Sequence, residues 1–207
     1  MKPSSLERAL DAMESIMPGE PYSLKPGDPK RKLIHEIARI ARELKIRPVV
    51  IGGLAVNHHG YLRVTVDVDL LLSKDDAVKL HRRLKEELGW KRFGEGFKHL
   101  ASGVGVDFCV AGGGTSPSWK EHFPQPTGIK TVKVTPLPVA ALSELVILKA
   151  KSGRLKDDGD LGELLKRHPK RIDSLHKTAR NRLTTEEARR HLDEVVARAK
   201  IELARRG

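Results

Sequence analysis

Two stretches decide the fold: Ile51-Gly52-Gly53-Leu54-Ala55 and, soon after it, Arg63-Val64-Thr65-Val66-Asp67-Val68-Asp69-Leu70. An apolar run that meets a glycine pair predicts a buried strand over 48–51, a turn and a short helix over 54–59. The second stretch is rich in β-branched residues and alternates polar with apolar ones, which predicts a strand over 64–72. The polar face of that strand is expected to hold Arg63, Thr65, Asp67 and Asp69, and the core face Val64, Val66, Val68 and Leu70.

Acidic residues gather on the polar face. Asp67 and Asp69 would lie about 7 Å apart at their Cα atoms, and a divalent cation such as Mg²⁺ would relieve their repulsion. Asp107 lies between apolar residues on a predicted strand over 103–110, and it joins the same face if that strand pairs beside 66–72. Three acids on adjacent strands suit two metal ions and an in-line phosphoryl displacement.

The glycine pair supplies a second signal for phosphate chemistry. Gly52 and Gly53 have no Cβ atoms, so backbone N–H groups at this turn can approach a ligand, and the start of a helix favours phosphate. A tight turn would explain the glycines alone, and a solvated strand face would explain Asp67-x-Asp69 alone. The combination at this spacing indicates phosphoryl transfer.

These motifs resemble the DNA polymerase β-like nucleotidyltransferase superfamily, whose pattern is a glycine pair, two acids on one strand and a third acid on a neighbouring strand. A later run, LKAKSGRLKDDGDL at 148–161, is similar to a signature of small bacterial nucleotidyltransferases, including those of abortive-infection and toxin–antitoxin systems. The resemblance covers about residues 30–165. It implies an α+β fold: a small mixed β-sheet core flanked by helices, with a helical C-terminal extension.

The resemblance also implies an enzyme that moves a nucleoside monophosphate from an NTP, such as ATP, to an acceptor hydroxyl. Two Mg²⁺ ions, with Mn²⁺ as an alternative, would bind Asp67 and Asp69, and Asp107 would complete the second metal site and help to deprotonate the acceptor. The expected nucleotide-binding residues are Gly52, Gly53, Arg63, Thr65 and Lys149. One departure from the family is Leu54, because many members carry Ser or Thr directly after the glycines.

Several of these residues have a structural alternative. Arg63 could form a salt bridge with a nearby Asp, and Lys149 could lie at a helix C-terminus because cations are favoured there. Asp157 and Asp160 are better explained by a helix cap or a salt bridge to Arg154 than by a metal site.

Charge gives the expected partners. The 207 residues include 39 Lys and Arg against 27 Asp and Glu, a net charge of +12 that indicates an anionic partner. RNA or tRNA is the favoured acceptor, a protein hydroxyl is next, and an aminoglycoside or lincosamide antibiotic is third. A cognate toxin or antitoxin is a further expected partner. A non-catalytic module of the same fold, binding nucleic acid or a protein, is the competing class, motivated by Leu54 and the basic C-terminal helices.

The remaining features of the sequence indicate where the protein is found and how its domains are arranged along the chain. There is a single cysteine, Cys109, no signal peptide, and no run of the ~18 apolar residues that span a bilayer, so we expect a cytoplasmic protein without membrane contact. Residues 1–45 are expected to form N-terminal helices over 5–17 and 28–45, 46–137 the core, and 138–207 a helical region, as one compact unit. Further strands are expected over 97–102 and 131–134, and a capping box at 184–187 starts the last helix.

Overall fold

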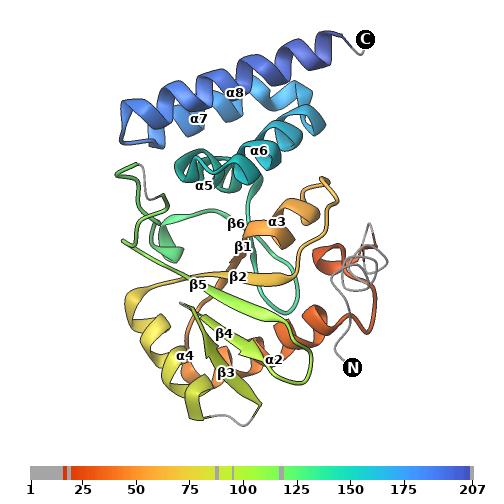
Figure 1. Ribbon diagram of the computed structural model, residues 1–207, viewed down its shortest axis with the longest axis vertical. Helices are drawn as coiled ribbons and strands as arrows, with labels where there is room; N and C mark the ends of the chain where they lie inside the picture. Colours follow the sequence, from red (N-terminus) through yellow and green to blue (C-terminus); the bar gives the residue numbers. More distant parts are fainter. Residues whose placement is uncertain (1–15, 18–19, 87–88, 95, 117–118, 206–207) are drawn as a thin grey trace.

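The fold is described from a computed structural model, for residues 16–17, 20–86, 89–94, 96–116 and 119–205 (Figure 1). The helices are α2 (Pro29–Leu44), α3 (Gly52–His58), α4 (Lys74–Glu86), α5 (Leu142–Ser152), α6 (Leu155–Arg167), α7 (Ile172–Arg182) and α8 (Glu186–Ala204), with 3-10 turns η1 (Pro21–Ser23), η2 (Pro126–Gly128) and η3 (Pro169–Arg171). The strands are β1 (Val49–Ile51), β2 (Asp67–Leu72), β3 (Trp90–Phe93), β4 (Gly96–His99), β5 (Gly105–Val110), β6 (Thr131–Val132) and β7 (Val139–Ala140). Within those residues, no helix is long and apolar enough to cross a membrane.

The strands form one mixed sheet in the order β3-β4-β5-β2-β1-β7-β6. The central strand β2 runs antiparallel to β1 and parallel to β5, and β1 runs parallel to β7. Parallel pairing requires a long connection, and α4 with the β3–β4 hairpin provides it between β2 and β5. The mixed sheet with flanking helices confirms the predicted α+β class.

The two faces of the sheet pack against different elements. Val68, Leu70 and Leu72 of β2 belong to the large core that also contains apolar residues of α2 and α4. Leu71 points the other way, into a smaller cluster with Leu148 of α5. In Figure 1, α2 and α4 lie below β1 and β2, at the level of β3 and β4, and α5 to α8 lie above these strands. The face that carries the odd-numbered residues of β2, including both aspartates, therefore looks toward α5.

The helical C-terminal region is tied to the loop that follows β5. The Glu121 side chain is 0% exposed, and its Oε1 accepts hydrogen bonds from the backbone N–H groups of Thr184 (2.5 Å) and Thr185 (2.9 Å). Its Oε2 accepts one from Lys151 Nζ at 2.8 Å. A single buried carboxylate thus joins the loop, α5 and the start of α8.

The prediction that the central strand begins at Val64 is wrong, because β2 begins at Asp67. The side chain of Asn57 exchanges two hydrogen bonds of 2.9 Å with the backbone of Arg63, and these hold the preceding segment away from the sheet. Val66, expected in the core, is 57% exposed. The predicted short helix also starts earlier than expected, at Gly52.

The other predicted elements compare as follows. α2 agrees with the helix expected over 28–45: Asp28 is its N-cap and accepts from the Lys30 N–H at 2.7 Å, an arrangement typical of an Asp followed by Pro. β4 and β5 agree with the strands expected over 97–102 and 103–110, whereas β3 and β7 were not expected. The N-cap of α8 is Thr185 rather than the predicted first residue of the capping box. The expected helix over 5–17 lies mostly outside the described residues.

Candidate functional site

Three carboxylates share the sheet face that looks toward α5. Asp69 of β2 is the register partner of Asp107 on β5, and Asp67 is opposite Gly105. Neighbouring strands are about 4.8 Å apart, so Asp69 and Asp107 are adjacent residues on one face. Asp67 and Asp69 are half-buried, and Asp107 is exposed. The structure therefore places the three acids that the sequence singled out on one face of two neighbouring strands.

Glycines make room for two of these carboxylates. A Cβ atom on Gly52, whose φ is +62°, would lie 1.8 Å from Asp69 Oδ2. The Gly53 N–H donates a hydrogen bond of 3.3 Å to the same oxygen. A Cβ atom on Gly105 would lie 2.3 Å from Asp67 Oδ1. In this structure, Gly52 therefore leaves the space that the Asp69 carboxylate occupies, and the Gly53 N–H donates a hydrogen bond to that carboxylate.

The carboxylates point in different directions. Asp69 leans toward Gly52 and Gly53, whereas Asp67 leans across to Gly105 on the other side of β2. Among the residues that the structure describes, no three His, Cys, Asp or Glu side chains converge closely enough to hold a metal ion. Repulsion between like charges favours this divergence. The three carboxylates on adjacent strands are hard oxygen donors, which is the kind of ligand that Mg²⁺ prefers.

The electrostatics of the site show that its acids affect one another. Burial raises the pKa of Asp69, which Lys149 and the Gly53 N–H oppose. Burial also raises the pKa of Asp107, and the negative charges of Asp69 and Asp67 raise it further. On the same face, burial and the neighbouring acids raise the pKa of the Cys109 thiol to about 12. The face therefore favours an added positive charge.

A buried ion-pair network lies behind the carboxylates. Lys149 of α5 is 6% exposed and pairs with Asp157 and, at 2.7 Å, with Asp160 of α6. Arg63 donates two hydrogen bonds to Asp160, from Nε to Oδ1 at 2.5 Å and from Nη2 to Oδ2 at 2.7 Å. The salt-bridge alternative for Arg63 is thus the one observed, with Asp160 as its partner. Arg154 Nε contacts Asp157 Oδ2 at 2.7 Å, as the sequence suggested.

Thr65 does not lie on the strand with the acids. It precedes β2, is 9% exposed, and packs so closely that a Cβ atom on Gly53 would lie 2.4 Å from its Oγ1. Its observed contact is therefore with the glycine turn. The expectation that Arg63 and Thr65 continue the acidic strand face is wrong, because the hydrogen bonds between Asn57 and the Arg63 backbone hold this segment outside the sheet.

The space between the carboxylates and α5 is small. A cavity of about 50 Å³ is lined by residues that include Gly52, Asp69, Cys109, Lys149 and Asp157. Ligand pockets of proteins usually measure about 300–1,000 Å³, so a nucleotide would need this cleft to widen or would enter from the exposed side of Asp107.

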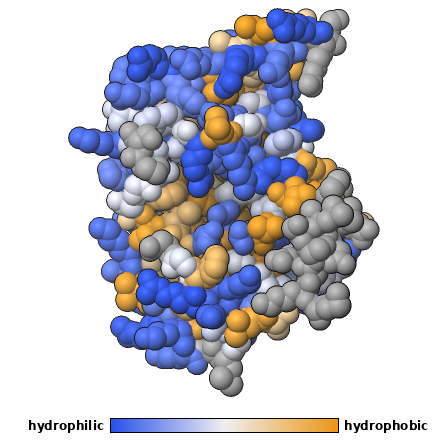
Figure 2. Space-filling view, in the orientation of Figure 1, coloured by the Kyte–Doolittle hydropathy of each residue, from blue (hydrophilic) through white to orange (hydrophobic). Residues whose placement is uncertain are grey.

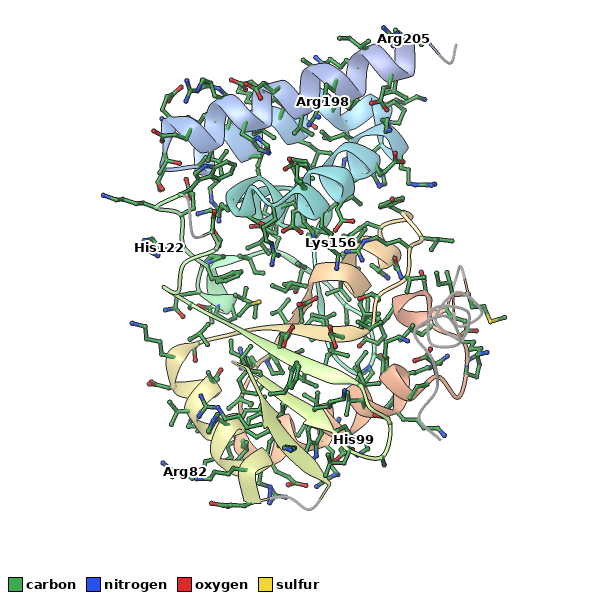
Figure 3. The ribbon with its side chains drawn as sticks, viewed as in Figure 1. Arg82, His99, His122, Lys156, Arg198 and Arg205 are labelled. Atoms are coloured by element: carbon green, nitrogen blue, oxygen red, sulfur yellow. The ribbon has the colours of Figure 1, made fainter. Side chains whose placement is uncertain are left out.

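One exposed cation lies near this cleft. Lys156 projects from α6 into the region between α6 and α3 (Figure 3), and its charge lowers the pKa of Asp69. No ion pair joins Lys156 to any residue of the described ranges. A phosphate group beside Asp69 would therefore find a cation that is not already neutralised.

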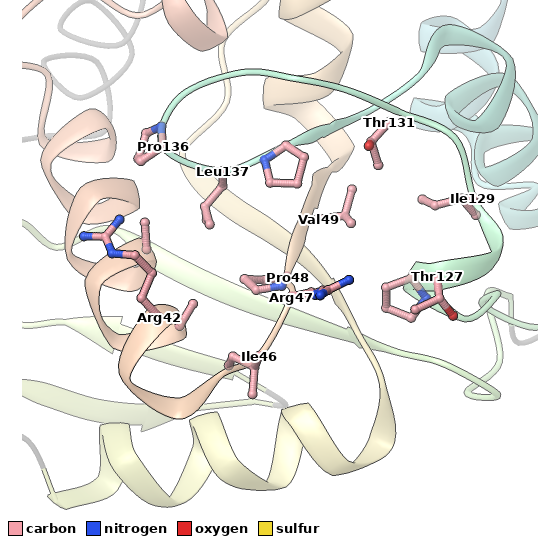
Figure 4. Close-up of a pocket in the computed structure, with 14 residues that line it drawn as sticks. Arg42, Ile46, Arg47, Pro48, Val49, Thr127, Ile129, Thr131, Pro136 and Leu137 are labelled. Atoms are coloured by element: carbon pink, nitrogen blue, oxygen red, sulfur yellow. The ribbon is translucent and has the colours of Figure 1, made fainter.

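Another cavity, of about 430 Å³, lies at the far end of β1 beside α2 (Figure 4). Its lining is mostly apolar, and its charged residues are Arg42 and Arg47. Since none of the three acids and no other carboxylate lines it, it is not the candidate active site.

The sequence did not predict that four charged residues form one network: Lys149, Asp157, Asp160 and Arg63. The acids were recognised only as a cap or as partners of Arg154. The signal that could have found them is their i, i+3 spacing, which places both on one side of α6 where it meets Lys149.

No family model matches the chain, and no curated protein matches its sequence. Its structure is similar to that of the antibiotic-resistance factor ANT(2'')-Ia, with a TM-score of 0.49 and 13% identity over 75% of this chain and 94% of that one. It is also similar to an antigenic nucleotidyltransferase-like protein from Paracoccidioides brasiliensis (TM-score 0.49, 15% identity, 83% and 93% covered). A third similar structure is the STING-associated CdnE c-di-GMP synthase from Capnocytophaga granulosa (0.35, 13%, 84% and 79%). A likeness at this level leaves the activity of the chain to be judged from its own residues.

Proposed function

We propose that this chain is a Mg²⁺-dependent nucleotidyltransferase that moves a nucleoside monophosphate from an NTP to an acceptor hydroxyl. The observation that carries the proposal is the sheet face on which Asp69 lies opposite Asp107 with Asp67 beside them. Gly52 and Gly105 leave room for two of these carboxylates, so the local sequence is fitted to them.

Each acid has a role in this proposal. Asp67 and Asp69 would hold Mg²⁺, which, when bound, neutralises triphosphate charge. The side chain of Asp107 is open to solvent on one side, while partial burial of its carboxyl and then the charges of Asp69 and Asp67 raise its pKa, so it is suited to accept a proton. The acceptor oxygen forms a bond to the α-phosphorus, the bond to pyrophosphate breaks, and the hydroxyl proton goes to an oxygen of Asp107.

Cations behind and beside the acids would support the triphosphate. Lys156 carries a charge that no described residue pairs, and we assign it to the phosphates. The positive charge of Lys149 lowers the pKa of Asp69, and ion pairs with Asp157 and Asp160 fix the position of Lys149. Gly52 and Gly53 would contribute backbone N–H groups once the Asp69 carboxylate turns toward a cation.

The net charge of +12 favours RNA as the acceptor, ahead of a protein hydroxyl and an antibiotic. A cytoplasmic location, where NTPs and RNA are present, agrees with this order. The resemblance to abortive-infection and toxin–antitoxin enzymes makes a cognate protein partner part of the proposal.

Calorimetry with each NTP, with and without Mg²⁺, tests the proposal against a non-catalytic module of the same fold. The narrow cleft and Leu54 favour the module, which would bind RNA or protein without nucleotide. We expect Mg²⁺-dependent binding of at least one NTP, together with a mass increase of one nucleoside monophosphate on an RNA from a total cellular extract. Salt-sensitive RNA binding without any nucleotide binding would overturn the proposal.

A further inference from the structure

We propose that single-stranded RNA binds a basic groove along α4, formed by Lys74, Ala77, Val78, His81, Arg82 and Lys85 together with Phe108 and Val110 of β5. This α4 groove would lead an RNA end over the open edge of β5 to Asp107. The inference rests on the proposed function and names the acceptor and its docking surface.

The sequence of α4 places one kind of side chain on this surface. The six helix residues follow the spacing i, i+3, i+4, i+7, i+8 and i+11, so they share one side of the helix. Three are cations at neutral pH, and one is a histidine. The acids of α4, which are Asp75, Asp76 and Glu86, do not line the groove. An anion is therefore the charge that this surface complements.

The cations of the groove are available to an external ligand. Lys74, Arg82 and Lys85 are exposed, and no hydrogen bond or ion pair joins their side chains to a residue in the described part of the chain. Lys149, Lys151 and many other cations of the protein are already paired. In Figures 2 and 3, hydrophilic side chains cover the lower left of the molecule, where α4 lies and Arg82 projects outward.

The shape of the groove suits unstacked bases between phosphate contacts. Its cavity measures about 670 Å³, and Val78, an apolar residue on a surface helix, is 58% exposed there. Phe108 forms the floor, and the His81 ring packs edge-on against Phe97 at 5.0 Å. Apolar surface between cations is what single strands use, because bases offer flat faces and the backbone offers charge. Lys74 and Lys85 are about 16 Å apart along the helix axis, enough for several nucleotides.

The groove ends close to the carboxylates. Phe108 and Val110 line it from one face of β5, while Asp107, the residue before Phe108, points to the other face. The neighbouring strand β4 pairs with β5 only at Gly105 and Val106, so in the described structure the later part of β5 has an open edge. An RNA strand that leaves the groove across this edge would pass from the Phe108 side of β5 to the Asp107 side.

The test compares two variants that each remove three positive charges from exposed helix positions. The first replaces Lys74, Arg82 and Lys85 with Gln; the control replaces Lys170, Lys177 and Arg190 with Gln. Binding of a labelled, mixed-sequence single-stranded RNA to the full chain is measured by fluorescence anisotropy without NTP, at about 50 mM and about 200 mM salt. Circular dichroism verifies that both variants fold.

We expect the groove variant to bind at least about ten times more weakly at low salt, and its slope of log K against log salt to fall by about 2, because each contact contributes about 0.7. The control should stay near the wild type. Equal weakening of both variants would overturn the inference, as would capture of poly-glutamate by the groove in place of RNA. If the groove binds RNA but no NTP is ever consumed, the proposed function fails and the docking surface stands.

Discussion

Replacing Gly52 with alanine is expected to weaken the fold and to displace Asp69. The added Cβ atom would lie 1.8 Å from Asp69 Oδ2, at a position whose φ is +62°. The left-handed backbone costs an alanine about 1–2 kcal/mol. Because two non-bonded atoms cannot come so close, the carboxylate must also rotate and lose the hydrogen bond from Gly53, at a further cost of about 1 kcal/mol.

Gly103 provides the matched control for this change. Its φ is +69°, and a Cβ atom there would meet nothing within 4 Å. Gly103→Ala therefore shares the backbone cost without the collision. In urea unfolding we expect a loss of about 1–2 kcal/mol for Gly103→Ala and about 2–3 kcal/mol for Gly52→Ala.

The activity difference should be larger than the stability difference. A catalytic group moved by about 1 Å can lose about 100-fold in rate, so Gly52→Ala should lower transfer from a labelled NTP by at least that factor. Gly103→Ala should transfer at the wild-type rate. Wild-type transfer by a folded Gly52→Ala protein would refute the reasoning that this glycine seats a catalytic carboxylate.

Three further changes test the packing around the site. Asp157→Asn should cost about 3–5 kcal/mol at neutral pH, because it leaves Lys149 and Arg63 with the single carboxylate of Asp160 in a buried network. Burial acts to raise the pKa of Asp157, but Lys149 holds it below its ordinary value, so this stability is present above about pH 4. Urea unfolding should show the two proteins converging below that pH. Tyr22→Phe removes a buried hydroxyl that bonds Leu137 O at 2.8 Å and should cost about 1–3 kcal/mol. Since burial raises the pKa of Tyr22 to about 12, the difference in thermal stability should persist to about pH 10 and shrink from there toward pH 12. Glu121→Gln should cost about 3 kcal/mol or more in thermal unfolding, whereas the exposed Glu187→Gln should change stability by less than about 0.5 kcal/mol.

Local sequence was enough to predict the elements that position the acids. The Asp-Pro start of α2, the strand-to-glycine turn at Gly52 and the alternation of Asp67 with Asp69 depend on neighbours a few residues away. Their outcome agrees with the structure because propensity, capping and alternation all favour the same local conformation. The place of Asp107 beside Asp69 followed from two strand patterns that needed only to pair.

Contacts between distant residues account for what the sequence did not predict. The segment before β2 leaves the sheet because the side chain of Asn57 holds its backbone, and no periodicity reports such a bond. Likewise, the pairing of Arg63 and Lys149 with Asp160 joins two helices, α5 and α6, to the segment before β2. Sequence could offer several acids as partners, and only the packing of α5 against α6 selects among them.

The direction of the carboxylates was also beyond the sequence. Alternation gives the face on which Asp67 and Asp69 lie, but rotamers depend on the space around them. That space comes from Gly52 on one side and Gly105 on the other, at positions far apart in the chain. Gly52 and Gly53 were expected to offer backbone N–H groups to a phosphate. In the structure, Gly52 instead leaves space for the Asp69 carboxylate, and the Gly53 N–H donates a hydrogen bond to it.

The most direct measurement is the mass gained by an RNA acceptor after incubation with Mg²⁺ and NTPs, comparing the wild type with Asp69→Asn. Asp75→Asn is the control, because it removes the same charge from an exposed position on α4. We predict addition of one nucleoside monophosphate by the wild type and by Asp75→Asn, and at least about 100-fold less by Asp69→Asn. Undiminished transfer by Asp69→Asn would contradict the assignment of this sheet face as the active site.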